Sequence, residues 1–134
     1  MKFLLDTCTV SDFVKGEAGV LARIKETTPD LVAISVITRM EIEFGLLLNP
    51  ARARKIAPML NAFLESIEVL PFDEADAMAA AAIRAALQKR GRPIGAYEIQ
   101  IAGCGMARSL TVVTSNEREF RRVSGLLVEN WRQT

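Results

Sequence analysis

Short apolar segments alternate with longer helical patterns along most of this 134-residue chain, and this alternation strongly constrains the fold. It predicts parallel strands joined by helical crossovers, with helices covering both faces of the sheet. The expected fold class is therefore α/β, with a mainly parallel central sheet of about five strands. These strands are expected at residues 2–5, 31–35, 67–70, 111–114 and, at an edge of the sheet, 126–129.

Helical patterns fill the intervals between the expected strands. Breaks between them are marked by Pro29, Pro50, Pro71 and the Gly91-Arg92-Pro93 turn. Nothing repeats internally and no linker divides the chain, so residues 1–134 are expected to form one domain. We expect helices at 9–15, 18–27, 36–48, 52–65, 74–90, 95–109 and 117–122.

The composition excludes several kinds of chemistry. The chain contains no histidine, so Ser-His-Asp and Cys-His hydrolases and His-ligated zinc enzymes each lose a required residue. Its two cysteines, Cys8 and Cys104, form no CxxC pair, which argues against a zinc site and against a disulfide framework. No apolar run approaches the ~20 residues that span a bilayer, and the N-terminus does not have the pattern of a signal peptide. We therefore expect a soluble, cytoplasmic protein.

Four acidic or amide side chains adjoin apolar segments, where an unpaired charge is costly. Asp6 closes the first expected strand and Asn116 follows the fourth, so in a parallel sheet both would lie at the carboxyl edge. Glu41 lies at the border of the apolar face of its helix, and Glu98 projects from a helix that is almost entirely apolar. A shared pocket that holds a divalent cation would account for all four.

Each of these residues also has a simpler structural explanation. Asp6 and Asn116 could cap the helices that follow them. Glu41 could reach solvent or pair with an arginine, and Glu98 could be stabilised by the dipole at the start of its helix, by ~0.3–1 kcal/mol. Because burial of an unpaired carboxylate costs several kcal/mol, the cation is the better explanation of Glu98.

Oxygen ligands without thiolate or imidazole suit Mg²⁺, with Mn²⁺ as an alternative. A divalent ion held in this way can activate water and stabilise charge that develops on a phosphate. Residues 81–134 hold 9 basic and 4 acidic side chains, a balance that suits contact with a nucleic-acid backbone, although a solvated helix face is the simpler explanation of any one basic cluster. Together these features predict metal-dependent hydrolysis of phosphodiester bonds.

Four segments of the chain resemble, in the right order, the motifs of PIN-domain ribonucleases. Their order and their spread over nearly the whole chain make the resemblance specific. The ending from Arg122 to Trp131 further resembles the VapC toxins of bacterial VapBC toxin–antitoxin modules. The four segments are Phe3 to Thr7, Ser35 to Ile42, Gly91 to Ala102 and Val113 to Phe120.

The resemblance implies a three-layer α/β/α fold and a Mg²⁺-dependent endoribonuclease that is the toxin of a type II toxin–antitoxin system. A VapB-type antitoxin would inhibit it by binding along an apolar groove. Homodimers and toxin–antitoxin hetero-oligomers are also implied. Many VapC proteins act on structured RNA such as tRNA, so RNA is the implied substrate.

Carried over to this chain, the resemblance makes Asp6 and Glu98 the principal metal ligands. Glu41 would bind or orient the metal, directly or through water. Asn116 would complete this catalytic set of four residues.

Further residues have supporting roles in the family pattern. Thr7 and Thr114 offer hydroxyl groups beside the expected metal. Glu119 matches an additional acidic position of some members, although on a helix it could instead face solvent or pair with Arg122. The arginines expected to contact RNA phosphates are Arg39, Arg90, Arg92 and Arg118.

Two residues depart from the family pattern. Cys8 stands where many members have Asn, which removes a hydrogen-bond donor without affecting the metal ligands. Glu98 stands where the pattern has Asp, and its extra methylene moves the carboxylate by ~1.5 Å, enough to alter the geometry that Mg²⁺ demands.

The departure at Glu98 leaves alternatives open. The enzyme could be attenuated, or the chain could be a catalytically weak subunit that serves antitoxin binding and regulation. A Mg²⁺-binding phosphoacceptor signalling domain is a third alternative, although such a domain needs a lysine at the end of a late strand and none lies near Thr114.

Overall fold

Five parallel strands form the centre of the protein, in a computed structural model that describes residues 1–132. The order across the sheet is β3-β2-β1-β4-β5, and every neighbouring pair is parallel. The predicted α/β class and the five-stranded parallel sheet are therefore confirmed. The strands are β1 (Phe3–Leu5), β2 (Val32–Ser35), β3 (Glu68–Leu70), β4 (Thr111–Val113) and β5 (Val128–Glu129).

Helices connect successive strands, and each helix predicted from the sequence is present. Two helices begin two residues before their predicted starts at positions 9 and 52, because the side chain of Asp6 caps α1 and that of Asn49 caps α4. The helices α6 and α7 each end two residues before the predicted positions 109 and 122. The last strand is also shorter than the predicted segment 126–129. The helices are α1 (Thr7–Lys15), α2 (Ala18–Glu26), the 3₁₀ turn η1 (Pro29–Leu31), α3 (Val36–Leu48), α4 (Pro50–Ser66), α5 (Glu74–Lys89), α6 (Ala96–Ala107) and α7 (Glu117–Phe120).

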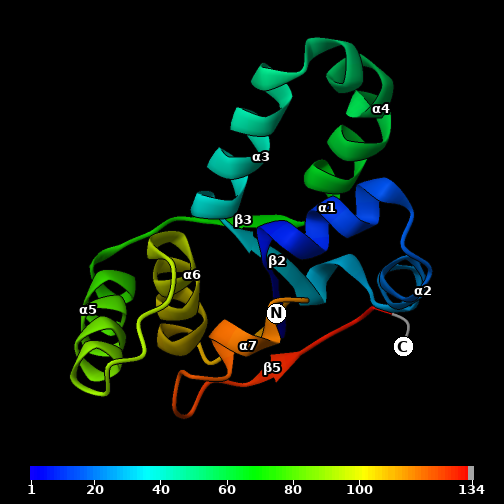
Figure 1. The fold of residues 1–134 in the computed structure, drawn as a ribbon. Coiled ribbons are helices and arrows are strands. Elements are labelled where there is room, and N and C mark those ends of the chain that lie inside the picture. Colours follow the sequence, from blue (N-terminus) through cyan, green and yellow to red (C-terminus); the bar gives the residue numbers. More distant parts are fainter. Residues whose placement is uncertain (133–134) are drawn as a thin grey trace.

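The helices lie on both faces of the sheet, which confirms the three-layer arrangement (Figure 1). Alternate strand residues face opposite layers, as the pleat of a strand requires. Leu4 and Val112 pack into a core with α5 and α6, whereas Leu5 and Ile34 pack into a second core with α1, α2 and α4. The helical hairpin of α3 and α4 extends beyond the sheet (Figure 1).

Close packing of α5 against α6 depends on Gly103. A Cβ atom at that position would lie 2.8 Å from the Asp76 carbonyl oxygen and 2.8 Å from the Ala80 Cβ atom. Beside this contact the buried carboxylate of Asp76 accepts a hydrogen bond from Arg108 at 3.0 Å. The two helices are thus held by small residues along their contact and by an ion pair at one end.

The cysteines and the hydropathy of the helices can be compared with the sequence expectations for residues 1–132. Cys8 is exposed and Cys104 is buried, and both are free thiols. None of the helices within residues 1–132 combines the length and the hydropathy that a membrane-spanning segment needs.

Candidate active site

The carboxyl ends of three neighbouring strands bring the predicted site residues to one edge of the sheet. Leu5 is in register with Ile34 on β2 and with Val113 on β4. The residues that follow these strands therefore lie side by side at this edge, where parallel sheets collect functional groups. Asp6 and Thr114 are two of them.

Asp6 is buried and begins α1. Its Oδ1 atom accepts a hydrogen bond from the backbone N–H of Thr9 at 2.9 Å, so the predicted helix cap is present. Burial raises the pKa of Asp6 to about 6, and the charge of Glu98 adds to this effect, although hydrogen bonds from Thr114 and Thr9 lower the pKa. Capping therefore does not compensate the carboxylate for its loss of water.

Glu41 is tied to the start of α1 by a short hydrogen bond. The hydroxyl of Thr7 donates to Glu41 Oε1 at 2.6 Å, and it lies 3.4 Å from the hydroxyl of the buried Thr38, one turn earlier on α3. Glu41 thus contacts a predicted supporting residue, and no arginine pairs with it among the described residues. Thr38 was missed in the sequence analysis, where a polar residue inside the apolar α3 segment was the available signal.

Glu98 lies in the first turn of α6, and its carboxylate folds back over the residue that precedes the helix. A Cβ atom at Gly95 would lie 2.0 Å from Glu98 Oε2, so the glycine provides the space that this carboxylate occupies. Sequence reasoning also missed the role of Gly95. Its signal is the position of a small residue just before a helix start, three residues ahead of the acid.

Glu119 joins α7 to the start of α6. Its Oε1 atom accepts a hydrogen bond from the backbone N–H of Gly95 at 2.9 Å, and its Oε2 atom accepts one from the Asn116 amide at 2.5 Å. The alternatives of a solvent-facing Glu119 or a pair with Arg122 are therefore wrong. Asn116 does not cap α7 with its side chain, and its backbone N–H donates to the Thr114 hydroxyl at 2.9 Å.

The four carboxylates of this region form no ion pair with any of residues 1–132. All ion pairs among residues 1–132 involve other acids, namely Asp12, Glu43, Asp73, Asp76, Glu117 and Glu129. Asp6 is buried, whereas Glu41, Glu98 and Glu119 are half-buried. Because a buried charge without a partner is costly, this group of carboxylate oxygens fits a hard divalent cation such as Mg²⁺. The pocket residues are Asp6, Glu41, Glu98 and Glu119.

The side chains do not form a closed cage. Within residues 1–132 no three Asp, Glu, Cys or His groups converge at metal-ligating distances. Mg²⁺ commonly binds through one or two protein carboxylates and several waters, so a site for it does not require three such groups. Although Cys8 is exposed as a residue, partial desolvation of its thiol and the charges of Asp6, Asp12 and Glu98 raise the pKa of that thiol to about 11, so Cys8 is a protonated, neutral neighbour at pH 7.

The four arginines predicted to contact RNA do not form one cluster of free cations. Arg39 pairs with Glu43 on α3 at 2.9 Å. Arg90 donates a hydrogen bond to the Arg122 carbonyl oxygen at 2.9 Å. Arg92 and Arg118 are exposed. Their contact with phosphate stays a prediction.

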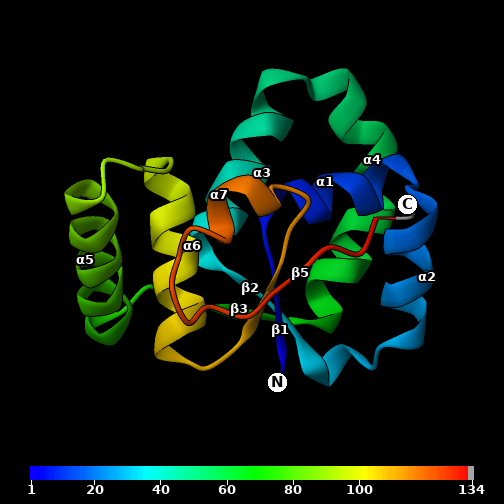
Figure 2. The same cartoon turned by 60° about the horizontal axis from the view of Figure 1, so that its bottom comes forward.

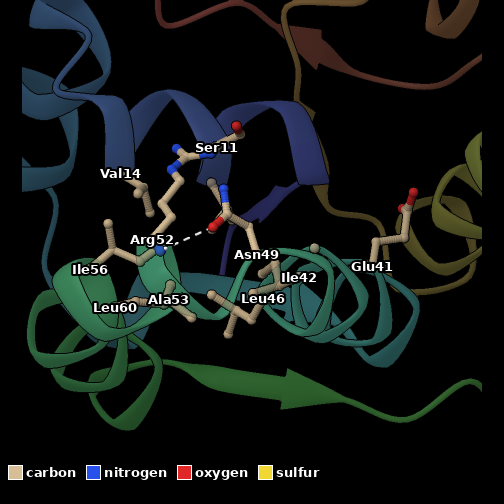
Figure 3. Close-up of a pocket in the computed structure, with 12 residues that line it drawn as sticks. Ser11, Val14, Glu41, Ile42, Leu46, Asn49, Arg52, Ala53, Ile56 and Leu60 are labelled. Atoms are coloured by element: carbon tan, nitrogen blue, oxygen red, sulfur yellow. Dashed lines mark hydrogen bonds between the residues drawn. The ribbon is translucent and has the colours of Figure 1, made fainter.

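An apolar groove runs beside the acidic pocket, between α1 and the α3–α4 hairpin (Figure 3). Its volume is about 170 Å³. Glu41 stands at one end of the groove and Val14 and Ile56 at the other, and the Arg52 side chain points towards Ser11 between them (Figure 3). The apolar lining comprises Val10, Val14, Ile42, Leu46, Ile56 and Leu60.

The chain matches known proteins over almost its whole length. The sequence model of the PIN domain covers residues 3–126. The chain is 36% identical over 131 residues to the tRNA(fMet)-specific endonuclease VapC of Salmonella typhimurium, and 32% identical over 132 residues to ribonuclease VapC2 of Haemophilus influenzae. Each alignment covers 98% of both proteins.

Solved structures agree with these relatives. The DNA-bound VapBC of Salmonella typhimurium matches with a TM-score of 0.88 and 35% identity, covering 98% of both chains. VapBC2 of Rickettsia felis bound to a promoter DNA fragment matches with a TM-score of 0.89 and 26% identity, covering 98% of this chain and 99% of the other. The fold, the acidic pocket and these relatives show that the chain belongs to the VapC family of PIN-domain ribonucleases.

Proposed function

We propose that the protein is a metal-dependent endoribonuclease that acts as the toxin of a VapBC-type toxin–antitoxin system. One observation supports this most directly. Asp6 is buried beside the charge of Glu98 in a pocket that has no cationic partner among the described residues. Such a pocket is unfavourable for folding alone and suits a divalent cation.

The acidic residues would have two roles in RNA cleavage, namely binding the cation and orienting it. Asp6 and Glu98 would hold the cation. Glu41, fixed by the Thr7 hydroxyl, would bind it through water or orient it. Mg²⁺ or Mn²⁺, when bound, supplies positive charge that activates water and stabilises the phosphate during attack.

The supporting residues keep the pocket in shape. Glu119 holds the start of α6, which carries Glu98, against Asn116 on the adjacent turn. The Thr114 hydroxyl hydrogen-bonds Asp6 and accepts from the Asn116 backbone. These hydrogen bonds limit the movement of Asp6 and of the start of α6, as a preorganised site requires.

Two apolar surfaces of the protein suit protein partners. The groove between α1 and the α3–α4 hairpin suits the apolar side of a VapB-type antitoxin segment, and solved relatives are VapBC complexes. Val36, Met40 and Phe44 recur every four residues and form an exposed apolar stripe on α3, which supports a homodimer. Measurement of the molar mass in solution, with and without antitoxin, tests both assemblies.

The strand order disfavours the phosphoacceptor alternative. Receiver-like domains have the order 2-1-3-4-5, in which β1 lies between β2 and β3. Here β1 lies between β2 and β4. Together with the family relationship, this leaves the attenuated nuclease and the catalytically weak binding subunit as the alternatives to a fully active enzyme.

Cleavage of RNA by the purified protein tests the proposal. A tRNA pool is the first substrate to use, because the Salmonella relative is named as a tRNA(fMet)-specific endonuclease. We expect discrete cuts with Mg²⁺ or Mn²⁺, and none with a chelator or in the Asp6→Asn variant. Failure of both the wild type and Glu98→Asp to cut any RNA with either metal would favour the binding subunit.

A further inference from the structure

The C-terminal segment leaves the sheet at the same edge as the acidic pocket. Val113 on β4 is in register with Glu129 on β5. The backbone N–H of Asp6 donates to the Val113 carbonyl at 3.0 Å, and that of Thr114 donates to the Glu129 carbonyl at 2.9 Å. Asn130 follows β5 at the same edge of the sheet at which Asp6 follows β1 and Thr114 follows β4. Neighbouring strands of a sheet are ~4.8 Å apart.

Trp131 fixes the chain just beyond this edge. Its side chain is buried, and its indole N–H donates to Glu129 Oε1 at 3.0 Å. The ring meets Phe3 edge to face, with 5.1 Å between the centroids. On another side the Arg23 guanidinium lies 4.7 Å from the indole centroid. The position of the next residue, Arg132, is thereby well defined.

Arg132 is held by a buried carboxylate. Its Nε and Nη2 atoms donate to the two oxygens of Asp12, each at 2.8 Å. The Asp12 side chain is 8% exposed, whereas the Arg132 side chain is 51% exposed. Among residues 1–132, Arg132 makes no other side-chain hydrogen bond, so the outer edge of its guanidinium, Nη1 and part of Nη2, can meet a second anion. That edge has the geometry that binds a phosphate with two parallel hydrogen bonds.

A hollow of about 440 Å³ opens beside this guanidinium, between α2 and the C-terminal segment. Arg23, Asn130 and Arg132 supply its polar lining, and Gly19 and Ala22 of α2 leave it open. In Figure 2 the β5 strand leads from the centre of the molecule to this side, close to α1 and α2. Both Arg132 and the acidic pocket thus adjoin α1.

We propose that Arg132, oriented by Asp12, is a positioning residue that binds a phosphate of the RNA strand beyond the cleavage site. Asp12 lies six residues after Asp6, or ~9 Å along the axis of α1. A strand cut at the acids can reach the hollow within a few nucleotides. This inference rests on the proposed nuclease function and assigns part of its substrate contact.

The test removes the positive charge of Arg132 without leaving the buried Asp12 carboxylate unpaired. In the double variant Asp12→Asn/Arg132→Gln both charges are lost, so the fold keeps a neutral pair in place of the ion pair. Arg84→Gln is the matched control. Its exposed arginine lies on α5, and α5 and α2 lie at opposite ends of the molecule in both views (Figures 1 and 2).

Binding of a labelled single-stranded RNA is measured by fluorescence anisotropy in chelator, over a series of salt concentrations. We expect the double variant to bind about tenfold more weakly at low salt. Its plot of log affinity against log salt should lose ~0.7 units of slope, the value for one phosphate contact on a single strand. Asp12→Asn alone should lose part of this affinity, because the Arg132 guanidinium remains but is no longer oriented by the Asp12 carboxylate. Circular dichroism melting confirms that each variant is folded.

The outcomes separate this inference from the function on which it rests. If the wild type cuts RNA but the double variant matches Arg84→Gln in affinity and salt slope, the inference is wrong and the nuclease proposal stands. If the wild type neither binds nor cuts RNA, both are wrong. If the double variant loses affinity for a VapB-type antitoxin and keeps that for RNA, the contact belongs to a protein partner and the RNA assignment is overturned.

Discussion

Replacement of Asp6 by asparagine should stabilise the metal-free protein at neutral pH. The pKa of Asp6 is raised from 3.8 to about 6, chiefly by burial. A rise of about two pKa units corresponds to ~3 kcal/mol of folding free energy carried by the ionised side chain. Asparagine keeps the oxygen that accepts from the Thr9 N–H, so the cap of α1 survives. The variant removes the charge and little else.

The sign of the effect follows from proton linkage. Well below pH 3.8 Asp6 is protonated in both the folded and the unfolded protein, so it causes no loss of stability. Between pH ~4 and ~6 the unfolded chain ionises first, and wild-type stability falls by an amount that the variant does not lose. Above pH ~6 both states are ionised and the difference is constant. Asp6→Asn should therefore exceed the wild type by less than ~1 kcal/mol near pH 4 and by ~3 kcal/mol above pH ~6.5.

Urea unfolding in chelator, followed by circular dichroism from pH 4 to 8, measures this difference directly. Addition of Mg²⁺ should then stabilise the wild type and leave Asp6→Asn unchanged, because a ligand stabilises only the state that binds it. Equal or lower stability of Asp6→Asn at pH 7.5 in chelator would refute the reasoning. It would show that hydrogen bonds already compensate the charge.

Three further substitutions test the pocket and the core. Glu98→Asp should raise metal-dependent RNA cleavage if the longer side chain weakens the site, and equal or lower activity would contradict this. Gly95→Ala should displace the Glu98 carboxylate, which lies 2.0 Å from the added Cβ, and so reduce cleavage at least tenfold while the melting temperature changes little. Gly103→Ala should cost ~1–3 kcal/mol in urea unfolding because the added methyl meets backbone atoms of α5. Gly45→Ala on α3, with no atom within 4 Å, should be neutral or stabilising by up to ~1 kcal/mol and serves as the control.

The layered fold could be predicted because its signals are local. Short apolar runs such as Phe3–Leu5 bounded by helical patterns permit few arrangements other than parallel strands with crossovers. The start of α1 was placed two residues late although Asp6 was a candidate cap, because its first residues, Thr7 to Thr9, do not continue the apolar pattern of the helix.

The site was predictable to the extent that its acids sit where burial is costly. Asp6, Glu41 and Glu98 stand out for that reason, and the structure brings them to one region. The role of Glu119 was not readable, because its partners are an N–H at Gly95 and an amide at Asn116 on other segments. Hydrogen bonds of this kind depend on tertiary placement and leave no periodic signal.

The link between Glu119 and Gly95 explains why Glu98 remains available to a ligand. Glu98 is the third residue of α6, the position from which a glutamate commonly reaches back to the N–H of the capping residue. That N–H, on Gly95, already donates to Glu119. An acid from α7 therefore satisfies the start of α6, and the carboxylate of Glu98 is left beside Asp6 with its charge uncompensated. In the proposed metal-dependent nuclease, this arrangement would lower the stability of the empty site and raise its affinity for a cation.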